Sequence, residues 1–95
     1  MLNRIKRWKE KRQIQGFFRP NANVWLMDTS NSRMRKYIGC SVTLSWVDEK
    51  LLIRPVNADG CISTSSVLEK ECPSPDAVVF RTANSTYRFC KYANV

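Results

Sequence analysis

The stretch that decides the fold is YIGCSVTLSWV, which covers Tyr37–Val47. Apolar residues stand at every second position between small or polar ones, and they are Ile38, Cys40, Val42, Leu44 and Trp46. Successive side chains of a β-strand point to opposite faces of the sheet, so this alternation is typical of a strand with one buried and one solvated face. The stretch therefore predicts a long strand of an antiparallel sheet.

Short segments separated by turn residues follow this strand toward the C-terminus. Asp48, Glu49 and Lys50 form a short polar connection, which predicts a hairpin. Two prolines indicate a stiff loop over Lys70–Asp76. The strands predicted on this side are Leu51–Val56, Cys61–Glu69, Ala77–Thr82 and Thr86–Tyr92, with turns at Asn57–Gly60 and Ala83–Ser85.

A helical pattern begins the chain. Residues 2–15 are rich in Lys, Arg, Gln and Glu, which favour helices, and apolar residues recur among them at three-residue steps: Leu2, Ile5 and Trp8. We therefore expect an amphipathic helix with a narrow apolar stripe. Phe17 and Phe18 follow it, and we expect them to fill the core or to fix the angle at which the helix leaves it. A short strand is predicted at Val24–Asp28, and a loop at Thr29–Arg33.

These elements predict a mainly β (α+β) fold. We expect an N-terminal basic helix and a small antiparallel sheet of five or six strands, bent on itself or closed into a partly open barrel of the SH3-like or OB-like size class. A chain of 95 residues has room for one modest core. We divide it into a basic helical arm, residues 1–16, and a small β domain, residues 17–95.

The positive charge is concentrated in the N-terminal part of the chain. The net charge is +8; residues 1–37 hold ten Lys and Arg residues against two acids, whereas residues 38–95 hold six of each sign. Such an uneven distribution favours an anionic partner, which could be a nucleic acid, an anionic membrane or an acidic protein surface.

The residues of the common catalytic sites are missing. The sequence has no histidine, which excludes imidazole catalysis and zinc sites that contain histidine. The acids stand in turns and at the ends of elements, and no glycine-rich phosphate loop is present. We therefore expect no enzymatic activity, no cofactor, no metal and no small-molecule substrate.

The four cysteines have no CxxC spacing, and they are Cys40, Cys61, Cys72 and Cys90. We expect reduced thiols, with two disulfides or metal binding as the alternatives. Cys90, which stands beside Lys91 and close to Arg88, is the strongest candidate for a reactive thiol.

The sequence shows no targeting or membrane segment. Charged residues from Lys9 to Arg12 interrupt the N-terminal region, so no apolar run of a signal peptide follows the basic start. No window approaches the roughly 20 apolar residues of a transmembrane helix. We expect a cytoplasmic protein without integral membrane association.

Hydroxyl side chains are concentrated in RTANSTYRF, which covers Arg81–Phe89. On the residues alone, β-propensity and turn chemistry explain this string, and a face that touches a partner is the alternative. The string also resembles segments of small phage and prophage accessory proteins, over less than a fifth of the chain. This resemblance implies a host-interaction role, in the host cytoplasm if the chain is phage-encoded.

Four roles remain open for the basic helix: a solvated surface, a nucleic-acid contact, a protein-docking arm and a weak membrane-surface contact. We favour a non-enzymatic binding protein that docks on and modulates a larger host protein, with a nucleic-acid-processing enzyme as the expected class. The alternative is an OB-like protein that binds single-stranded DNA or RNA, with Trp8, Phe17, Phe18, Tyr37 and Tyr87 stacking on bases. The residues expected to bind the partner are Arg4, Lys6, Arg7, Trp8, Lys11, Arg12, Arg19, Arg33, Arg35 and Lys36.

Overall fold

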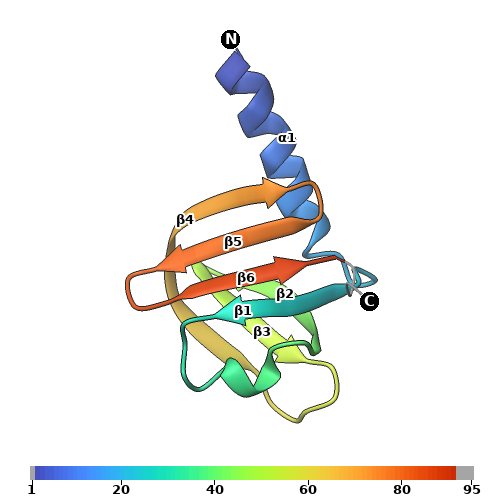
Figure 1. The fold of residues 1–95 in the computed structure, drawn as a ribbon, viewed down its shortest axis with the longest axis vertical. Helices are drawn as coiled ribbons and strands as arrows, with labels where there is room; N and C mark the ends of the chain where they lie inside the picture. The colour runs from blue at the N-terminus through green and yellow to red at the C-terminus, as the bar shows by residue number, and fades with distance from the viewer. Residues whose placement is uncertain (1, 92–95) are drawn as a thin grey trace.

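The protein is a small β-barrel with a helix leaving one end (Figure 1). The computed structural model describes the backbone of residues 2–91 and the side chains of residues 9–91. Its elements are α1 (Leu2–Gly16), β1 (Val24–Thr29), the 3-10 helix η1 (Arg35–Tyr37), β2 (Ser41–Val47), β3 (Lys50–Pro55), β4 (Ile62–Ser74), β5 (Ala77–Thr82) and β6 (Thr86–Cys90).

The strands form a simple antiparallel meander that closes on itself. Each strand pairs with the next along the chain, and β1 pairs with β6 to complete the barrel, for example through Leu26 and Phe89. The prediction of a mainly β fold with an N-terminal helix and five or six antiparallel strands is confirmed. The described residues form six strands, and the barrel is fully closed rather than partly open. The meander order differs from the five-stranded Greek-key order of an OB-fold.

Large apolar side chains from β1, β2, β3, β5 and β6 fill the barrel, and β4 adds the partly buried Ile62 and Val67. Its fully buried members include Leu26, Val42, Leu44, Leu51, Ile53, Val78, Phe80 and Phe89. Phe17 is only 1% exposed, so it fills the core as the sequence predicts, and it anchors the chain where α1 ends. Burying such apolar surface is the main stabilising contribution in a domain of this size.

The strand predicted over Tyr37–Val47 begins four residues later than the sequence suggests. Tyr37 ends the 3-10 helix η1, and Ile38 and Cys40 are exposed. The cause is Gly39, whose φ of +88° turns the backbone out of the extended conformation. The apolar alternation continues in the sequence across this turn, although only its second half lies on a strand.

The loop predicted over Lys70–Asp76 is wrong, because β4 continues through it to Ser74. Here β4 pairs with β5 alone, with Glu71 opposite Val79 and Ser74 opposite Ala77. A strand with one unpaired edge tolerates proline, which lacks the N–H group that a second neighbour would need. Only residues 75 and 76 form the turn.

The last turns of α1 pack on the barrel. Ile14 is buried, and Gln13 Nε2 donates hydrogen bonds to the carbonyl oxygens of Ser74 at 2.6 Å and Ala77 at 3.2 Å. The helix rises from there beyond the end of the barrel (Figure 1). Its C-terminal half therefore shares the core with the β domain, although the sequence analysis divides the two at residue 16.

Candidate functional site

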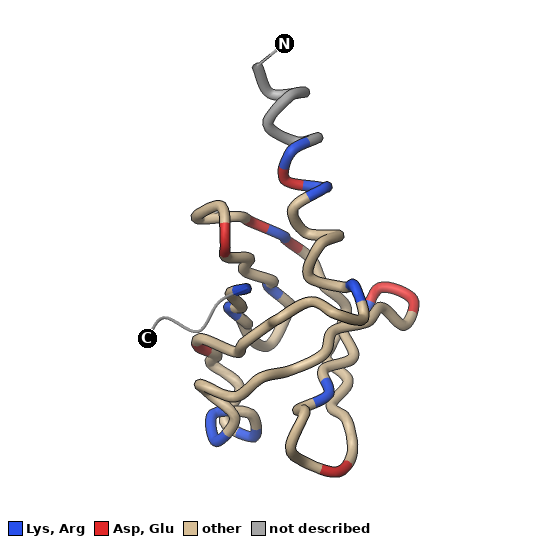
Figure 2. The backbone as a smooth tube through the Cα atoms, turned by 90° about the vertical axis from the view of Figure 1, so that its right-hand side faces the viewer, with Lys and Arg blue, Asp and Glu red and all other residues tan. Residues whose placement is uncertain are grey.

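The basic residues expected to bind a partner lie at two ends of the barrel. Lys11, Arg12 and Arg19 are exposed on α1 and just after it. The other group, Arg33, Arg35 and Lys36, is exposed in and before η1, which lies at the opposite end of the barrel (Figures 1 and 2). The side chains of Arg4, Lys6, Arg7 and Trp8 are outside the described residues. The structure therefore divides the predicted set and does not bring its two halves together.

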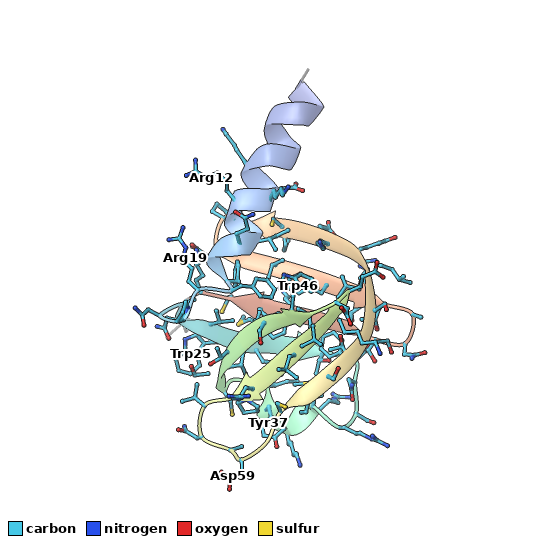
Figure 3. The ribbon with its side chains drawn as sticks, turned by 180° about the vertical axis from the view of Figure 1, so that it is seen from behind. Arg12, Arg19, Trp25, Tyr37, Trp46 and Asp59 are labelled. Carbon is cyan, nitrogen blue, oxygen red and sulfur yellow. The ribbon has the colours of Figure 1, made fainter. Side chains whose placement is uncertain are left out.

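A hollow of about 460 Å³ lies between α1 and the end of the barrel. We call it the barrel mouth. Barrel mouths and the spaces between helices and sheets are frequent binding sites. In Figure 3, Trp46 lies beside the foot of α1, with Arg12 and Arg19 on the other flank of the helix. The residues that line the barrel mouth are Glu10, Lys11, Ile14, Gln15, Phe18, Trp46 and Lys70.

Three aromatic rings build the floor of the barrel mouth. Phe18 stacks on Trp46 with ring centroids 4.9 Å apart and an interplanar angle of 14°. Phe80, from inside the barrel, meets both rings edge-on, at 6.0 Å from Phe18 and 5.7 Å from Trp46. Both geometries are favourable for aromatic pairs. The cluster holds Trp46 in place although its side chain is still 37% exposed.

Two lysines place positive charge at the rim of the barrel mouth. Lys70 Nζ lies 4.9 Å from the centroid of the Trp46 ring, which is a cation–π contact. Lys11 is exposed on the helix side, with Glu10 as the one acid of the lining. An apolar floor with cations at its rim is suited to a large apolar side chain that carries a carboxylate near it.

A second hollow continues the barrel mouth along β4. It measures about 280 Å³ and is lined by Trp46, Asp48, Glu49, Val67 and Lys70. Trp46 and Lys70 line both hollows, so the two adjoin at this pair of side chains, and we call them together the groove.

A polar hollow of about 560 Å³ lies on another side of the foot of α1. Its charged residues are Arg19 and Lys91, and Lys91 Nζ also lies 5.4 Å from the centroid of the Phe17 ring. The rest of its lining is Gly16 and residues 20–23. This lining includes Pro20 and Ala22 but no aromatic or branched aliphatic side chain, so the barrel mouth is the stronger candidate for docking.

The structure places the candidate reactive thiol, Cys90, in the core. Cys90 is buried, and burial raises the pKa of the half-buried Cys72 thiol, with Glu10 and Glu71 raising it further. A raised pKa keeps the thiol protonated, whereas a nucleophile needs the thiolate. Cys40 and Cys61 are exposed, and no disulfide joins any of the four cysteines. Residues 9–91 contain no group of three or more acids and cysteines that could hold a metal ion.

Two aromatic residues expected to stack on bases are inaccessible. Tyr87 is 2% exposed and its hydroxyl accepts a hydrogen bond of 2.9 Å from Asn31 Nδ2, while Phe17 is buried in the core. Tyr37 is half-buried, with Lys36 Nζ 5.2 Å from its ring centroid. The sequence pattern did not mark Trp46 as a site residue, because the position of Trp46 in the apolar alternation predicts a buried core side chain. The available signal was its position at the strand end, next to the polar turn.

Comparison with protein-family models, with curated proteins and with solved structures gives no significant match. Among the described residues, no helix has the length and apolar character needed to cross a bilayer.

Proposed function

We propose that this protein is a non-enzymatic binding protein that docks on a larger protein through the barrel mouth and the basic flank of α1. The observation that carries the proposal is the groove itself: a preformed aromatic floor, partly exposed, beside a helix that projects from the barrel. Within this proposal, a nucleic-acid-processing enzyme of a host cell is the class of partner that we expect, and modulation of that enzyme is the expected effect.

The rigid floor supports a protein partner. Binding energy at protein interfaces is concentrated where a few aromatic or arginine side chains meet a well-packed pocket. Trp46 is held by Phe18, Phe80 and Lys70, so little side-chain freedom is lost when a partner covers it. A pocket that is ordered before binding therefore favours affinity.

The exposed cations beside the groove support an acidic surface on the partner. Lys9, Lys11 and Arg12 are exposed on the part of α1 that flanks the barrel mouth, where Glu10 is the only acid. Charges at the rim of an interface mainly accelerate association and select the partner. We expect binding to weaken as salt rises, although the apolar floor keeps part of the affinity.

Direct binding of a nucleic acid is the competing function, and the exposed ring of Trp46 beside Lys70 is the observation that favours it. A base could stack there and its phosphates could contact lysines. The two basic groups lie at opposite ends of the barrel (Figure 2), so one strand would have to pass along the barrel to contact both. A nucleic-acid complex would lose affinity steeply with salt, because each neutralised phosphate releases counterions.

The test uses two charge-reversed variants with the same change in net charge. The first carries K11E and K70E at the barrel mouth, and the second carries R35E and K36E in η1. Each tagged protein is incubated with bacterial lysate treated with nuclease, and the retained proteins are quantified. We expect a specific partner that the first variant loses and the second keeps. Equal retention by both variants, or loss of every partner on nuclease treatment, would contradict the proposal.

A further inference from the structure

Among the residues that the structure describes, one edge of β4 has no neighbouring strand beside the barrel mouth. β3 pairs with β4 only as far as Ser66, opposite Lys50, and the last backbone bond on that side runs from the N–H of Val67 to the carbonyl of Glu49 at 2.8 Å. Beyond this point β4 continues to Ser74 and pairs with β5 alone. Figure 1 shows β4 passing the tip of the β2–β3 hairpin toward α1.

The unpaired edge is four residues long, from Leu68 to Glu71. At its far end α1 covers the strand, since Cys72 Sγ lies 4.0 Å from the carbonyl oxygen of Glu10 and Gln13 bonds the carbonyl of Ser74. Between the two ends Leu68 is 67% exposed, and Lys70 lines both parts of the groove. At about 3.3 Å per residue this edge spans roughly 13 Å.

We propose that the edge Leu68–Glu71 binds an extended segment of the partner protein as an added β-strand. An exposed strand edge presents unpaired N–H and C=O groups, which pair readily with another chain. The added strand would lie beyond the end of β3 and along the groove, with its alternate side chains directed into the barrel mouth. This inference rests on the proposed docking function and specifies its mode.

A second copy of this chain does not fit the edge. In an antiparallel pair of identical edges related by a two-fold axis, a residue faces either itself or a residue on the same face. Centred on Lys70, the pairing sets Lys70 against its own copy and Glu69 against Glu71. Centred on either glutamate, it sets that glutamate against itself. Centred on Leu68, it sets Glu69 against Val67, whose backbone N–H on this edge already bonds the carbonyl of Glu49. Like charges directly opposite each other destabilise a sheet, so the occupant is another protein.

The pairing with β5 defines the side chains that such a segment needs. Lys70 stands opposite the buried Phe80, so both lie on the inner face, whereas Glu69 stands opposite the exposed Arg81 on the outer face. Glu71 shares the outer face, where it forms an exposed ion pair with Arg81 at 3.5 Å, so Glu69 is the main acid for an added cation. A segment with large apolar residues on its inner face and Lys or Arg on its outer face would match the aromatic floor and the two glutamates.

The experiment uses the full chain and synthetic hexapeptides. The probe is acetyl-Lys-Val-Lys-Phe-Lys-Val-amide. One control peptide has glutamate in place of every lysine. A second control has the same composition as the probe, with the apolar residues grouped together so that the alternation is lost. Two further versions of the probe carry N-methyl groups on alternate amides. The first version is methylated on one alternating set of amides, and the second version is methylated on the other set. Methylation of the amides that face β4 removes the backbone bonds and leaves the side chains unchanged. Binding is followed by titration calorimetry and by amide NMR signals.

We expect the basic alternating peptide to bind, with shifted amide signals over Leu68–Glu71 and new protection only at the alternate amides that face away from β5. One methylated version should bind about tenfold more weakly or worse, and the other should keep most of its affinity, because only one set of amides faces the edge. Equal binding of both methylated versions, or no binding of the unmodified probe, would overturn strand addition. If the K11E/K70E variant still loses the partner that the R35E/K36E variant keeps, the proposed docking function stands without strand addition.

Discussion

Phe18 and Trp46 stack face to face, with ring centroids 4.9 Å apart, although 28 positions separate them along the chain. Phe18 follows α1, and Trp46 lies near the end of β2. The contact therefore joins the foot of the helix to the rim of the barrel. The barrel mouth therefore forms only when the end of α1 packs against the β-barrel.

Replacing Trp46 by alanine should lower the free energy of unfolding by about 1–2 kcal/mol, because the ring loses its aromatic contacts but is already partly exposed. Urea denaturation measures the change. V56A is the control, since Val56 is 59% exposed and its replacement should cost less than about 0.5 kcal/mol. Equal effects of the two substitutions would contradict the packing described for the barrel mouth.

Replacing Ile14 by aspartate should release α1 from the barrel. Ile14 is a buried apolar side chain in the described part of the helix, and a released helix with so many like charges is marginal on its own. We expect circular dichroism to lose helical signal and the amides of residues 9–16 to exchange faster with solvent. Q15D adds the same charge at an exposed position of the same helix and should retain the helix. Similar spectra for both variants would show that Ile14 does not hold α1.

Replacing Gly39 by alanine should cost about 1 kcal/mol, because its φ of +88° is unfavourable for a side chain although the space around it is open. Asparagine tolerates positive φ better than alanine, so G39N should be the more stable variant. Thermal unfolding of the two variants gives the comparison. Equal stability of G39A and the natural chain would mean that no strain arises at this turn.

The Cys72 thiol should make stability depend on alkaline pH. Its pKa is raised in the folded protein by burial and by two glutamates, so the fold favours the protonated form. This stabilisation is complete below the ordinary thiol pKa, about 8.5, and is lost as the pH rises through the higher pKa of the folded state. The free energy of unfolding should therefore fall more steeply between pH 8 and pH 10 in the natural chain than in C72A. Parallel pH profiles would contradict this assignment.

The sequence predicted the fold well where local pattern and tertiary structure agree. Val42 and Leu44 face the core because the alternation continues on a real strand, whereas Ile38 and Cys40 do not because Gly39 turns the chain first. Pro73 indicated a loop, since a sequence does not show that a strand has only one neighbour.

The site was harder to predict than the fold. The barrel mouth forms where Phe18, Trp46 and Lys70 meet, and each has an ordinary explanation in its own segment. The basic residues look like one set along the chain, but α1 and η1 lie at opposite ends of the barrel. The meeting of the three barrel-mouth residues and the separation of the two basic groups both depend on how the sheet closes, and local sequence patterns do not encode this closure.

The most direct test of the docking site is photo-crosslinking from Gln15, which is exposed and lines the barrel mouth. A photoreactive amino acid is placed at Gln15 and, as the control, at the exposed Arg35 in η1. After irradiation in nuclease-treated lysate, we predict a covalent adduct with one larger protein from Gln15 and none from Arg35. The account would be contradicted by the same adducts from both positions, or by no protein adduct from Gln15.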